Sequence, residues 1–349
     1  MIKHLYVHIP FCKKICPYCD FKKTIYNNDV ANKYIDLVCK KINRDYKKNK
    51  FNTIYVGGGT PNCLSNLQIN KLLQCLSKYL TNKHEFTIEI NPELLTNEQT
   101  RIFSLNHINR VSIGVQTMDN DLLKSIYRLS YHNVVKNAIQ FLLNNKIKNI
   151  SCDLIYGFQN QTNKNIKDDI DFLINNHVKH LSMYSLEIKP NTLWGKQHYL
   201  LDEFKIENNL KFIIRYLKKR HFIRYEVSNW AINDKYQSWH NVGIWKSHEW
   251  AAIGFGAHGM ENKYLYHYDG KILYWHLIQK RLTTNEFYYQ ILMMGLRLTE
   301  GIDLKIKNNY LAYQCFKDNL NKSKLIKIKN NHLICTNINL LDSLLVDLL

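Results

Sequence analysis

Short runs of β-branched and other apolar residues recur along the first half of the chain, and a longer amphipathic stretch follows each of them. The runs predict strands over residues 5–9, 53–56, 86–90, 110–115, 150–155 and 180–186. Apolar residues three and four positions apart predict helices between them, for example over residues 31–44, 67–80, 134–144 and 166–175. Strands that alternate with helices at this spacing predict an α/β fold, with a parallel sheet that closes into a full or partial barrel.

The pattern changes from about residue 280. A helix is expected over residues 285–298, and Gly301 suits its C-terminal stop. Two short strands, over residues 324–328 and 332–335, flank an Asn330-Asn331 turn and predict a hairpin. Asn337 is a suitable cap for a last helix. The order predicts a small winged-helix-like α+β module over residues 285–349, after a barrel over residues 1–235 and a connecting segment over residues 236–284.

The composition excludes several classes of protein. Of the 349 residues 45% are hydrophobic and 22% are charged, so the chain can bury a core and is not mainly disordered. No run of about 18 apolar residues predicts a membrane-spanning helix, and the first ten residues are too polar for a signal peptide. We therefore expect a cytoplasmic protein whose nine cysteines form no disulfide framework.

The formal net charge of +19 would suit binding to nucleic acid. The lysines are spread along the chain, however, and only short runs such as residues 47–50 and 218–220 stand out. We therefore favour a solvated basic surface and expect no specific nucleic acid partner.

Three cysteines follow the first predicted strand within eight residues, at Cys12, Cys16 and Cys19. Thiols this close on one loop can reach a common centre. Zinc would need a fourth ligand, and no Cys or His follows within the next ten residues. A 4Fe–4S cluster would use three thiols for three of its irons and leave the fourth iron open to a small molecule. The cluster is the favoured interpretation, with zinc and inert structural thiols as the alternatives.

Polar and glycine residues stand where the predicted strands end. The carboxyl ends of barrel strands meet at one end of the barrel, which is where active sites lie. Carboxylates, amides and an open glycine loop at that end would suit the hydroxyls and ring nitrogens of a nucleoside. Each residue alone could equally be a cap or turn residue. The set contains Gly57-Gly58-Gly59-Thr60-Pro61, Glu89, Gln116, Asp153, Tyr184 and Glu187.

The spacing C-x-x-x-C-x-x-C and its place after the first strand resemble the radical S-adenosylmethionine superfamily. The resemblance implies a 4Fe–4S cluster on Cys12, Cys16 and Cys19, whose open iron chelates S-adenosylmethionine. It implies that reduction cleaves the sulfonium and releases a 5′-deoxyadenosyl radical. It also implies a partial (βα)6 barrel.

Further motifs resemble the oxygen-independent coproporphyrinogen III dehydrogenase family and its HemW branch, over nearly the whole chain. Carried over by motif, the implied contacts to S-adenosylmethionine are Tyr6, Tyr18, Gly58, Gly59, Thr60, Glu89, Gln116, Arg128 and Asp153. Around Arg128 the family usually shows Gly-Arg-x-His, and this chain reads Tyr127-Arg128-Leu129-Ser130. The motifs that carry the resemblance are Tyr6-Val-His-Ile-Pro-Phe-Cys12, Cys19-Asp-Phe21, Gly57-Gly-Gly-Thr-Pro61, Ser112-Ile-Gly-Val-Gln116, Asp153-Leu-Ile-Tyr-Gly157, Tyr225-Glu-Val-Ser-Asn229, Gly254-Phe-Gly-Ala-His-Gly259 and Met294-Gly-Leu-Arg-Leu298.

Two features favour the HemW branch, whose members resemble heme-binding chaperones. The dehydrogenases resemble longer chains, with about fifty residues ahead of the cluster and a fourth cysteine in a C-x-C ending. Here the cluster motif starts at Cys12 and ends in Cys19-Asp20-Phe21. A third feature, His240-Asn-Val-Gly-Ile-Trp245, is similar to the branch's H-N-x-x-Y-W heme motif, with Ile244 in place of Tyr. Histidine is an axial ligand of heme iron, and the alternative is a buried, hydrogen-bonded His240.

The expected function is that of a heme chaperone with a 4Fe–4S cluster, S-adenosylmethionine and heme as cofactors. Its partners would be heme, a heme-acceptor protein, and an electron donor such as a flavodoxin or ferredoxin, with membrane contact only through the acceptor. The first alternative is oxidative decarboxylation of coproporphyrinogen III, where the cofactor would carry the chemistry and the protein would position the substrate. The second is a tRNA-modifying radical enzyme, supported by the basic charge and the winged-helix-like tail.

Overall fold

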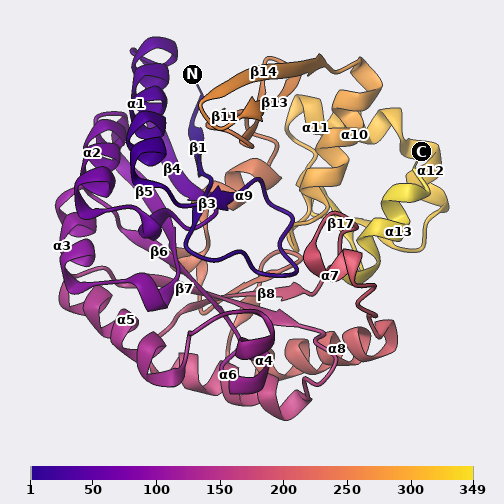
Figure 1. The fold of residues 1–349 in the computed structure, drawn as a ribbon. Coiled ribbons are helices and arrows are strands. Elements are labelled where there is room, and N and C mark those ends of the chain that lie inside the picture. The colour runs from indigo at the N-terminus through magenta and orange to yellow at the C-terminus, as the bar shows by residue number, and fades with distance from the viewer. Residues whose placement is uncertain (1, 349) are drawn as a thin grey trace.

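The six strands expected from the sequence are present and lie side by side in parallel, in the order of the chain. A computed structural model describes residues 2–348. Each strand pairs with the next one along the chain, and a helical connection returns to the same end of the sheet (Figure 1). The strands are β1 (His4–Ile9), β4 (Phe51–Gly58), β5 (Leu80–Ile90), β6 (Arg110–Gln116), β7 (Asn149–Tyr156) and β8 (His180–Ser185).

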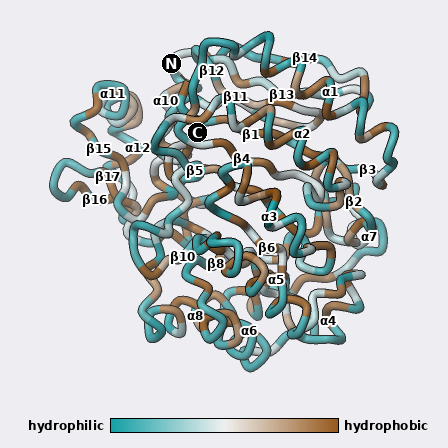
Figure 2. Tube along the Cα trace, turned by 90° about the vertical axis from the view of Figure 1, so that its left-hand side faces the viewer, coloured by the Kyte–Doolittle hydropathy of each residue, from teal (hydrophilic) through white to brown (hydrophobic). Residues whose placement is uncertain are grey.

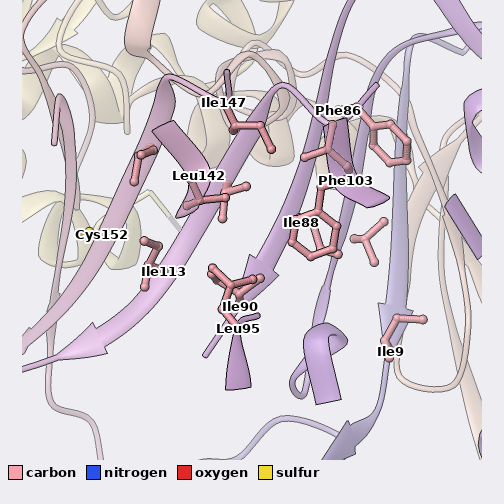
Figure 3. Packing of buried hydrophobic residues seen from close by; sticks show 14 of the residues in the cluster. Ile9, Phe86, Ile88, Ile90, Leu95, Phe103, Ile113, Leu142, Ile147 and Cys152 are labelled. Atoms are coloured by element: carbon pink, nitrogen blue, oxygen red, sulfur yellow. The ribbon is translucent and has the colours of Figure 1, made fainter. Parts of the chain in front are cut away.

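The outer face of this sheet is apolar and is covered by helices. Alternate residues of a strand point to opposite faces, and on β5 Phe86, Ile88 and Ile90 point outward. Figure 3 shows them packed near Phe103 and Leu142, from two of the covering helices. Full burial of such a side chain stabilises the fold by about 1.5–3 kcal/mol. The covering helices are α1 (Asn28–Asp45), α2 (Asn66–Ser77), α3 (Asn97–Leu105), α5 (His132–Asn144), α6 (Asn163–Asn175) and α8 (Glu203–Lys219).

The inner face of the same strands is polar. Residues at the alternate positions pair across neighbouring strands, for example His4 with Thr53 and Tyr6 with Tyr55. Such an interior is unsuited to be a dry core, because buried polar groups are costly unless they are hydrogen-bonded. The inward positions are His4, Tyr6, His8, Thr53, Tyr55, Gly57, Glu85, Thr87, Glu89, Arg110, Ser112, Gly114, Ser151, Asp153, His180, Ser182 and Tyr184.

The sheet extends beyond the six expected strands on both sides. We expected the segment 236–284 to connect two domains. It forms a short helix and four strands, and the strands join this sheet. β11 (Trp250–Ile253) pairs in parallel with β1, and β12 (His258–Glu261), β13 (Tyr264–Lys271) and β14 (Tyr274–Arg281) follow in antiparallel order. The other edge ends in β10 (Asn229–Ala231) and β9 (Ile223–Arg224). Within the described residues β14 and β9 are unpaired edges, so the barrel is partial.

The last part of the chain forms a smaller unit with its own apolar core, which includes Leu292, Leu320, Leu333 and Leu344. The expected hairpin is confirmed, and a third short strand completes a small sheet. Figure 2 shows this unit as a lobe beside the barrel. The domain boundaries at 235 and 284 stay a prediction. The elements of the lobe are α10 (Thr284–Gly295), β15 (Ile302–Asp303), α11 (Lys307–Cys315), α12 (Lys317–Lys322), β16 (Ile326–Lys329), β17 (His332–Cys335) and α13 (Leu341–Val346).

Candidate functional site

The loop that carries the three cysteines is held at the carboxyl end of β1. Two short strands, β2 (Phe11–Cys12) and β3 (Thr24–Ile25), pair in parallel and close the loop at its base. The loop lies in front of the ring of strands in Figure 1. Its far side is anchored by a hydrogen bond of 3.0 Å from the backbone N–H of Trp194 to the carbonyl of Pro17.

The three thiols differ in exposure. Cys12 is 7% exposed, whereas Cys16 and Cys19 are partly exposed. Burial raises the pKa of the Cys12 and Cys19 thiols. Within residues 2–348, no three Cys, His, Asp or Glu side chains lie close enough together to hold a single metal ion. A structural zinc site needs four ligands, and this loop carries three cysteines.

The glycine loop after β4 lies directly against the cysteine loop. The N–H of Gly59 donates to the carbonyl of Ile9 at 2.8 Å, and the Thr60 hydroxyl lies 3.5 Å from Cys12 Sγ. A Cβ at Gly59 would lie 2.9 Å from Cys12 Sγ, and Gly58 has φ +120°, which disfavours any other residue. Glycine is therefore required here by close approach of the backbone to the thiol of Cys12.

Glu89 ends β5 beside the glycine loop. Its carboxylate accepts from the Tyr55 hydroxyl at 2.7 Å and from the Gly58 N–H at 3.1 Å. Burial, together with the nearby charge of Asp153, raises the pKa of Glu89 to about 7. Asp153 accepts from the Ser112 hydroxyl at 3.1 Å, and burial raises its pKa as well. These two carboxyl groups face one polar lumen and can accept hydrogen bonds from hydroxyl or amino groups of a ligand.

The remaining predicted contact residues line the opening. Tyr6 lies 3.1 Å from His8 Nδ1 through its hydroxyl, and Tyr18 packs near Trp194. Gln116 ends β6 with φ +70°, at a break in the register with β7. A bulge of this kind turns a side chain away from the regular alternation.

Arg128 holds the end of β6 from below the surface. Its guanidinium is 5% exposed and pairs with Glu93 at 3.0 Å, and it also donates to the carbonyl of Gly114 at 2.5 Å. Burial acts against the charge of Arg128, but Glu93 and Cys16 raise its pKa above the ordinary value. Ser130, at the position where the family usually has His, donates to the carbonyl of Val115 at 3.0 Å.

His240 lies at the opposite end of the barrel. It belongs to α9 (Trp239–Trp245) and is 3% exposed. Its Nδ1 lies 2.8 Å from the Thr53 hydroxyl, which is also 2.8 Å from His4 Nδ1. His4 begins β1, so about 16 Å of strand separates this level from the cysteine loop. The surroundings fit the alternative that the sequence left open, a buried and hydrogen-bonded histidine.

Several residues that line the lumen were not predicted from the sequence as residues of the site. His8 donates through Nε2 to the carbonyl of Lys22 at 2.8 Å, and burial lowers its pKa to about 4, so it is neutral. Tyr55 links Glu89 to the ring of His240, which lies 5.2 Å away between centroids. Arg110 is 2% exposed, and its Nε has no partner among the described residues. Strand alternation could have identified His8 and Tyr55, because each is a polar residue between outward apolar neighbours. Arg110 begins its strand after Asn109, so the pattern around it is weaker.

The site fits a cluster and a nucleoside-bearing cofactor on the chemistry of its side chains. Three thiols without a fourth ligand leave one iron of a cluster free. Beside them lies a glycine backbone that approaches Cys12 closely. The lumen also holds two buried carboxyl groups and, farther from the thiols, an unpartnered guanidinium nitrogen of Arg110. The lumen therefore offers both hydrogen-bond acceptors and a donor to a polar ligand.

Comparison with the sequences of known proteins agrees with this interpretation of the site. The profile of the radical SAM superfamily matches residues 6–173. The chain is 33% identical to the heme chaperone HemW of Lactococcus lactis, over 73% of this chain and 68% of that protein. It is 31% identical to the heme chaperone HemW of Bacillus subtilis, over 87% of this chain and 86% of that protein. The chain belongs to the HemW family of radical SAM proteins.

A solved structure shows the same fold. The coproporphyrinogen III oxidase HemN from Escherichia coli, a radical SAM enzyme, superposes with a TM-score of 0.84 over 99% of this chain and 90% of that chain, at 17% identity. As a member of the superfamily, this HemW-family chain uses a 4Fe–4S cluster and S-adenosylmethionine. No helix among the described residues is long and apolar enough to cross a membrane.

Proposed function

We propose that the chain is a heme chaperone, which binds heme and passes it to an acceptor protein. The observation that carries this proposal is its identity of 31% to 33% with two heme chaperones of the family, over at least two thirds of each. The partly exposed cysteine loop and the polar lumen support it, since the family's cofactors need both.

Within this proposal, Cys12, Cys16 and Cys19 hold the 4Fe–4S cluster. When bound and reduced, the cluster supplies an electron for cleavage of the sulfonium of S-adenosylmethionine. The chain's own groups have simpler tasks. Glu89 and Asp153 accept hydrogen bonds from the ligand, and the backbone at Gly58 and Gly59 lets it approach the thiols.

The other predicted contacts frame the same ligand. Tyr6 and Tyr18 cover it, and Thr60 and Gln116 offer polar groups at the strand ends. Arg128 acts as a positioning residue, because it fixes the end of β6 through Glu93 and Gly114. An electron donor such as a flavodoxin or ferredoxin would reduce the cluster.

Anaerobic reconstitution followed by optical titration with hemin tests the proposal. We expect saturable binding of hemin, with iron and sulfide contents that match one cluster per chain. Hemin uptake that never saturates would contradict it.

Coproporphyrinogen III dehydrogenase activity is the competing function, because the fold is shared with HemN. We expect none when cluster, reductant and S-adenosylmethionine are supplied, since the motif ends in Cys19-Asp20-Phe21 without a fourth cysteine. Chromatography of the porphyrins decides the matter. Protoporphyrinogen formed over many turnovers would establish the enzyme instead.

A further inference from the structure

Two cysteines outside the cysteine loop face each other across two of the covering helices. α1 and α2 belong to successive strand-helix units, so they run in parallel and pack side by side on the outer face of the sheet (Figure 1). Cys39 lies on α1 and Cys75 lies on α2. Both are free thiols, and the Cys39 thiol donates a hydrogen bond to Cys75. The chain therefore holds a second group of thiols, which the cofactor site does not use.

Polar contacts on either side fix the position of this thiol pair. Toward the start of the helices, the Gln68 amide donates to Asn32 at 2.9 Å. Toward their end, the Tyr79 hydroxyl donates to Asn43 at 2.6 Å. The partners in both contacts are 36 positions apart, and so are the two cysteines. One register between α1 and α2 therefore makes all three contacts, and it keeps the thiols together.

The two thiols differ in how readily they lose a proton. Lys71 pairs with Asp36 across the helices one turn before Cys75, and Lys78 follows Cys75. The hydrogen bond from Cys39 and the charge of Lys78 lower the pKa of Cys75, although burial acts against them. The same hydrogen bond, together with burial, raises the pKa of Cys39. The thiolate is the nucleophilic form of cysteine, so Cys75 is the nucleophile of the pair.

Small oxidants can reach the pair from solvent. Cys39 is partly exposed and Cys75 is 8% exposed, on helices that cover the outside of the barrel. A metal is a poorer match for the pair, because two thiols are only half of the ligands of a structural zinc ion. The acidic side chain that faces α2 from α1, Asp36, is already paired with Lys71. Oxidation is thus the chemistry that two thiols in contact can perform here.

We propose that Cys39 and Cys75 form a reversible disulfide when the chain meets hydrogen peroxide, and that this bond locks α1 to α2. The inference does not rest on heme binding. α1 also holds the base of the cofactor site, because the Tyr34 hydroxyl donates to the carbonyl of His8 at 2.8 Å and accepts from the N–H of Phe255 at 2.8 Å. The disulfide therefore secures the helix that supports the cysteine loop while conditions are oxidising.

The reaction consumes one peroxide for each disulfide. The Cys75 thiolate attacks the peroxide, the O–O bond breaks, and Cys75 becomes a sulfenic acid while the released hydroxide takes a proton to form water. The sulfur of Cys39 then attacks the sulfur of Cys75, and the S–O bond breaks as the S–S bond forms. The hydroxyl group leaves with the proton of Cys39 as a second water. A dithiol reductant reverses the bond by thiol–disulfide exchange and is itself oxidised to a disulfide.

Peptide mapping without reduction tests the proposal, because trypsin separates the two cysteines. Cleavage after lysine leaves the cysteine of α1 in residues 34–40 and that of α2 in residues 72–78, each without a second cysteine. The full chain is treated with peroxide, and its remaining thiols are alkylated. We expect the two peptides to be linked, and to separate after reduction with dithiothreitol. The control Cys315→Ser, which removes an exposed thiol of the C-terminal lobe, should show the same link.

Thermal unfolding of the oxidised chain, with and without dithiothreitol, measures the lock. A disulfide between α1 and α2 restricts the unfolded chain and should raise the melting temperature by about 5 °C. Cys39→Ser should lose both the link and this difference, while Cys315→Ser keeps both. Bonds within the cysteine loop would act in every variant, so the comparison isolates the bond between the helices.

Each remaining result has a defined meaning. Cys39 and Cys75 recovered unlinked after peroxide treatment, whether alkylated or over-oxidised, would overturn the proposal. Links from either of them to another cysteine, or a link found only in dimers on a nonreducing gel, would overturn it as well. A link that leaves the melting temperature unchanged would overturn the lock. The melting temperature of reduced Cys39→Ser shows whether this variant folds as the wild type does, and Cys75→Ser replaces it otherwise.

Discussion

Polar side chains at the two ends of the barrel differ in whether they have hydrogen-bond partners. We call the end near His4 and His240 the floor and the end near the cysteine loop the rim. At the floor, the Thr53 hydroxyl hydrogen-bonds both His4 and His240, and Glu85 accepts from the backbone N–H groups of Trp239 and His240 at 2.9 and 3.0 Å. At the rim, the thiols of Cys16 and Cys19 are partly exposed, and the rings of His258 and His267 lack hydrogen-bond partners among the described residues. Side chains that satisfy each other hold the fold together, and those that remain unsatisfied are available to a ligand.

The largest expected effect is at the cysteine loop. Replacing Cys12, Cys16 and Cys19 together by Ala should abolish cluster assembly, because it removes all three predicted thiolate ligands. Iron and sulfide analysis after anaerobic reconstitution measures this.

A matched control for that variant is Cys315→Ala, since Cys315 is an exposed cysteine of the C-terminal lobe. It should keep the full iron content. Iron retention by the triple variant would show that the cluster is held elsewhere.

The next effect contrasts two histidines. His240→Ala should lower the free energy of unfolding by about 2–4 kcal/mol, because it leaves a cavity and removes a partner of the buried Thr53 hydroxyl. His258→Ala should change it by less than about 0.5 kcal/mol, as is usual at an exposed site. Urea unfolding of both variants gives the comparison. Equal losses in the free energy of unfolding would show that the histidines at the floor and at the rim contribute alike to stability.

A third effect depends on pH. The folded-state pKa of Glu89 is raised to about 7 from an ordinary 4.5, so the folded state binds the proton more tightly than the unfolded state. Its contribution to stability is therefore full below the unfolded pKa and is lost as the pH rises through about 7. Between pH 5.5 and pH 8 the loss should be about 1–2 kcal/mol.

Glu89→Gln should remove this part of the pH dependence. Asp171→Asn should not, because hydrogen bonds from Tyr216 and Lys167 lower the pKa of Asp171 further below this pH range. Urea unfolding of the apoprotein at four pH values tests the pair. A slope that persists unchanged in Glu89→Gln would mean that another group titrates there.

The smallest effect is at the exposed ion pair of the rim. Lys22→Ala breaks the contact with Asp269 and should cost no more than about 0.5 kcal/mol of stability, less at high salt. Thermal unfolding at low and high salt measures it. A loss of several kcal/mol would make Lys22 a structural residue and contradict the weakness expected of this ion pair.

The six parallel strands could be predicted because their outward residues are apolar and β-branched. The added strands β11 to β14 could not. Trp250–Ile253 is a short run without alternation of polar and apolar residues. The turn between β13 and β14 contains Ile272 and Leu273 rather than turn-forming residues. These two residues pack against the core, so tertiary contacts set the turn.

The cysteine site was predictable for a different reason, because its three ligands lie within eight residues of sequence. The hydrogen bonds of the lumen depend on strand order instead. Thr53 and His240 are 187 positions apart and meet only because α9 closes the floor beneath β1 and β4. The local motif around His240 could not show that its Nδ1 hydrogen-bonds the Thr53 hydroxyl.

The central claim is that the rim holds a cluster with one iron open to a small molecule. Electron paramagnetic resonance of the reconstituted and reduced chain, with and without S-adenosylmethionine, tests it most directly. We expect S-adenosylmethionine to change the g values of the reduced cluster, because it binds the iron that no thiol holds. Identical spectra with saturating S-adenosylmethionine would contradict the account.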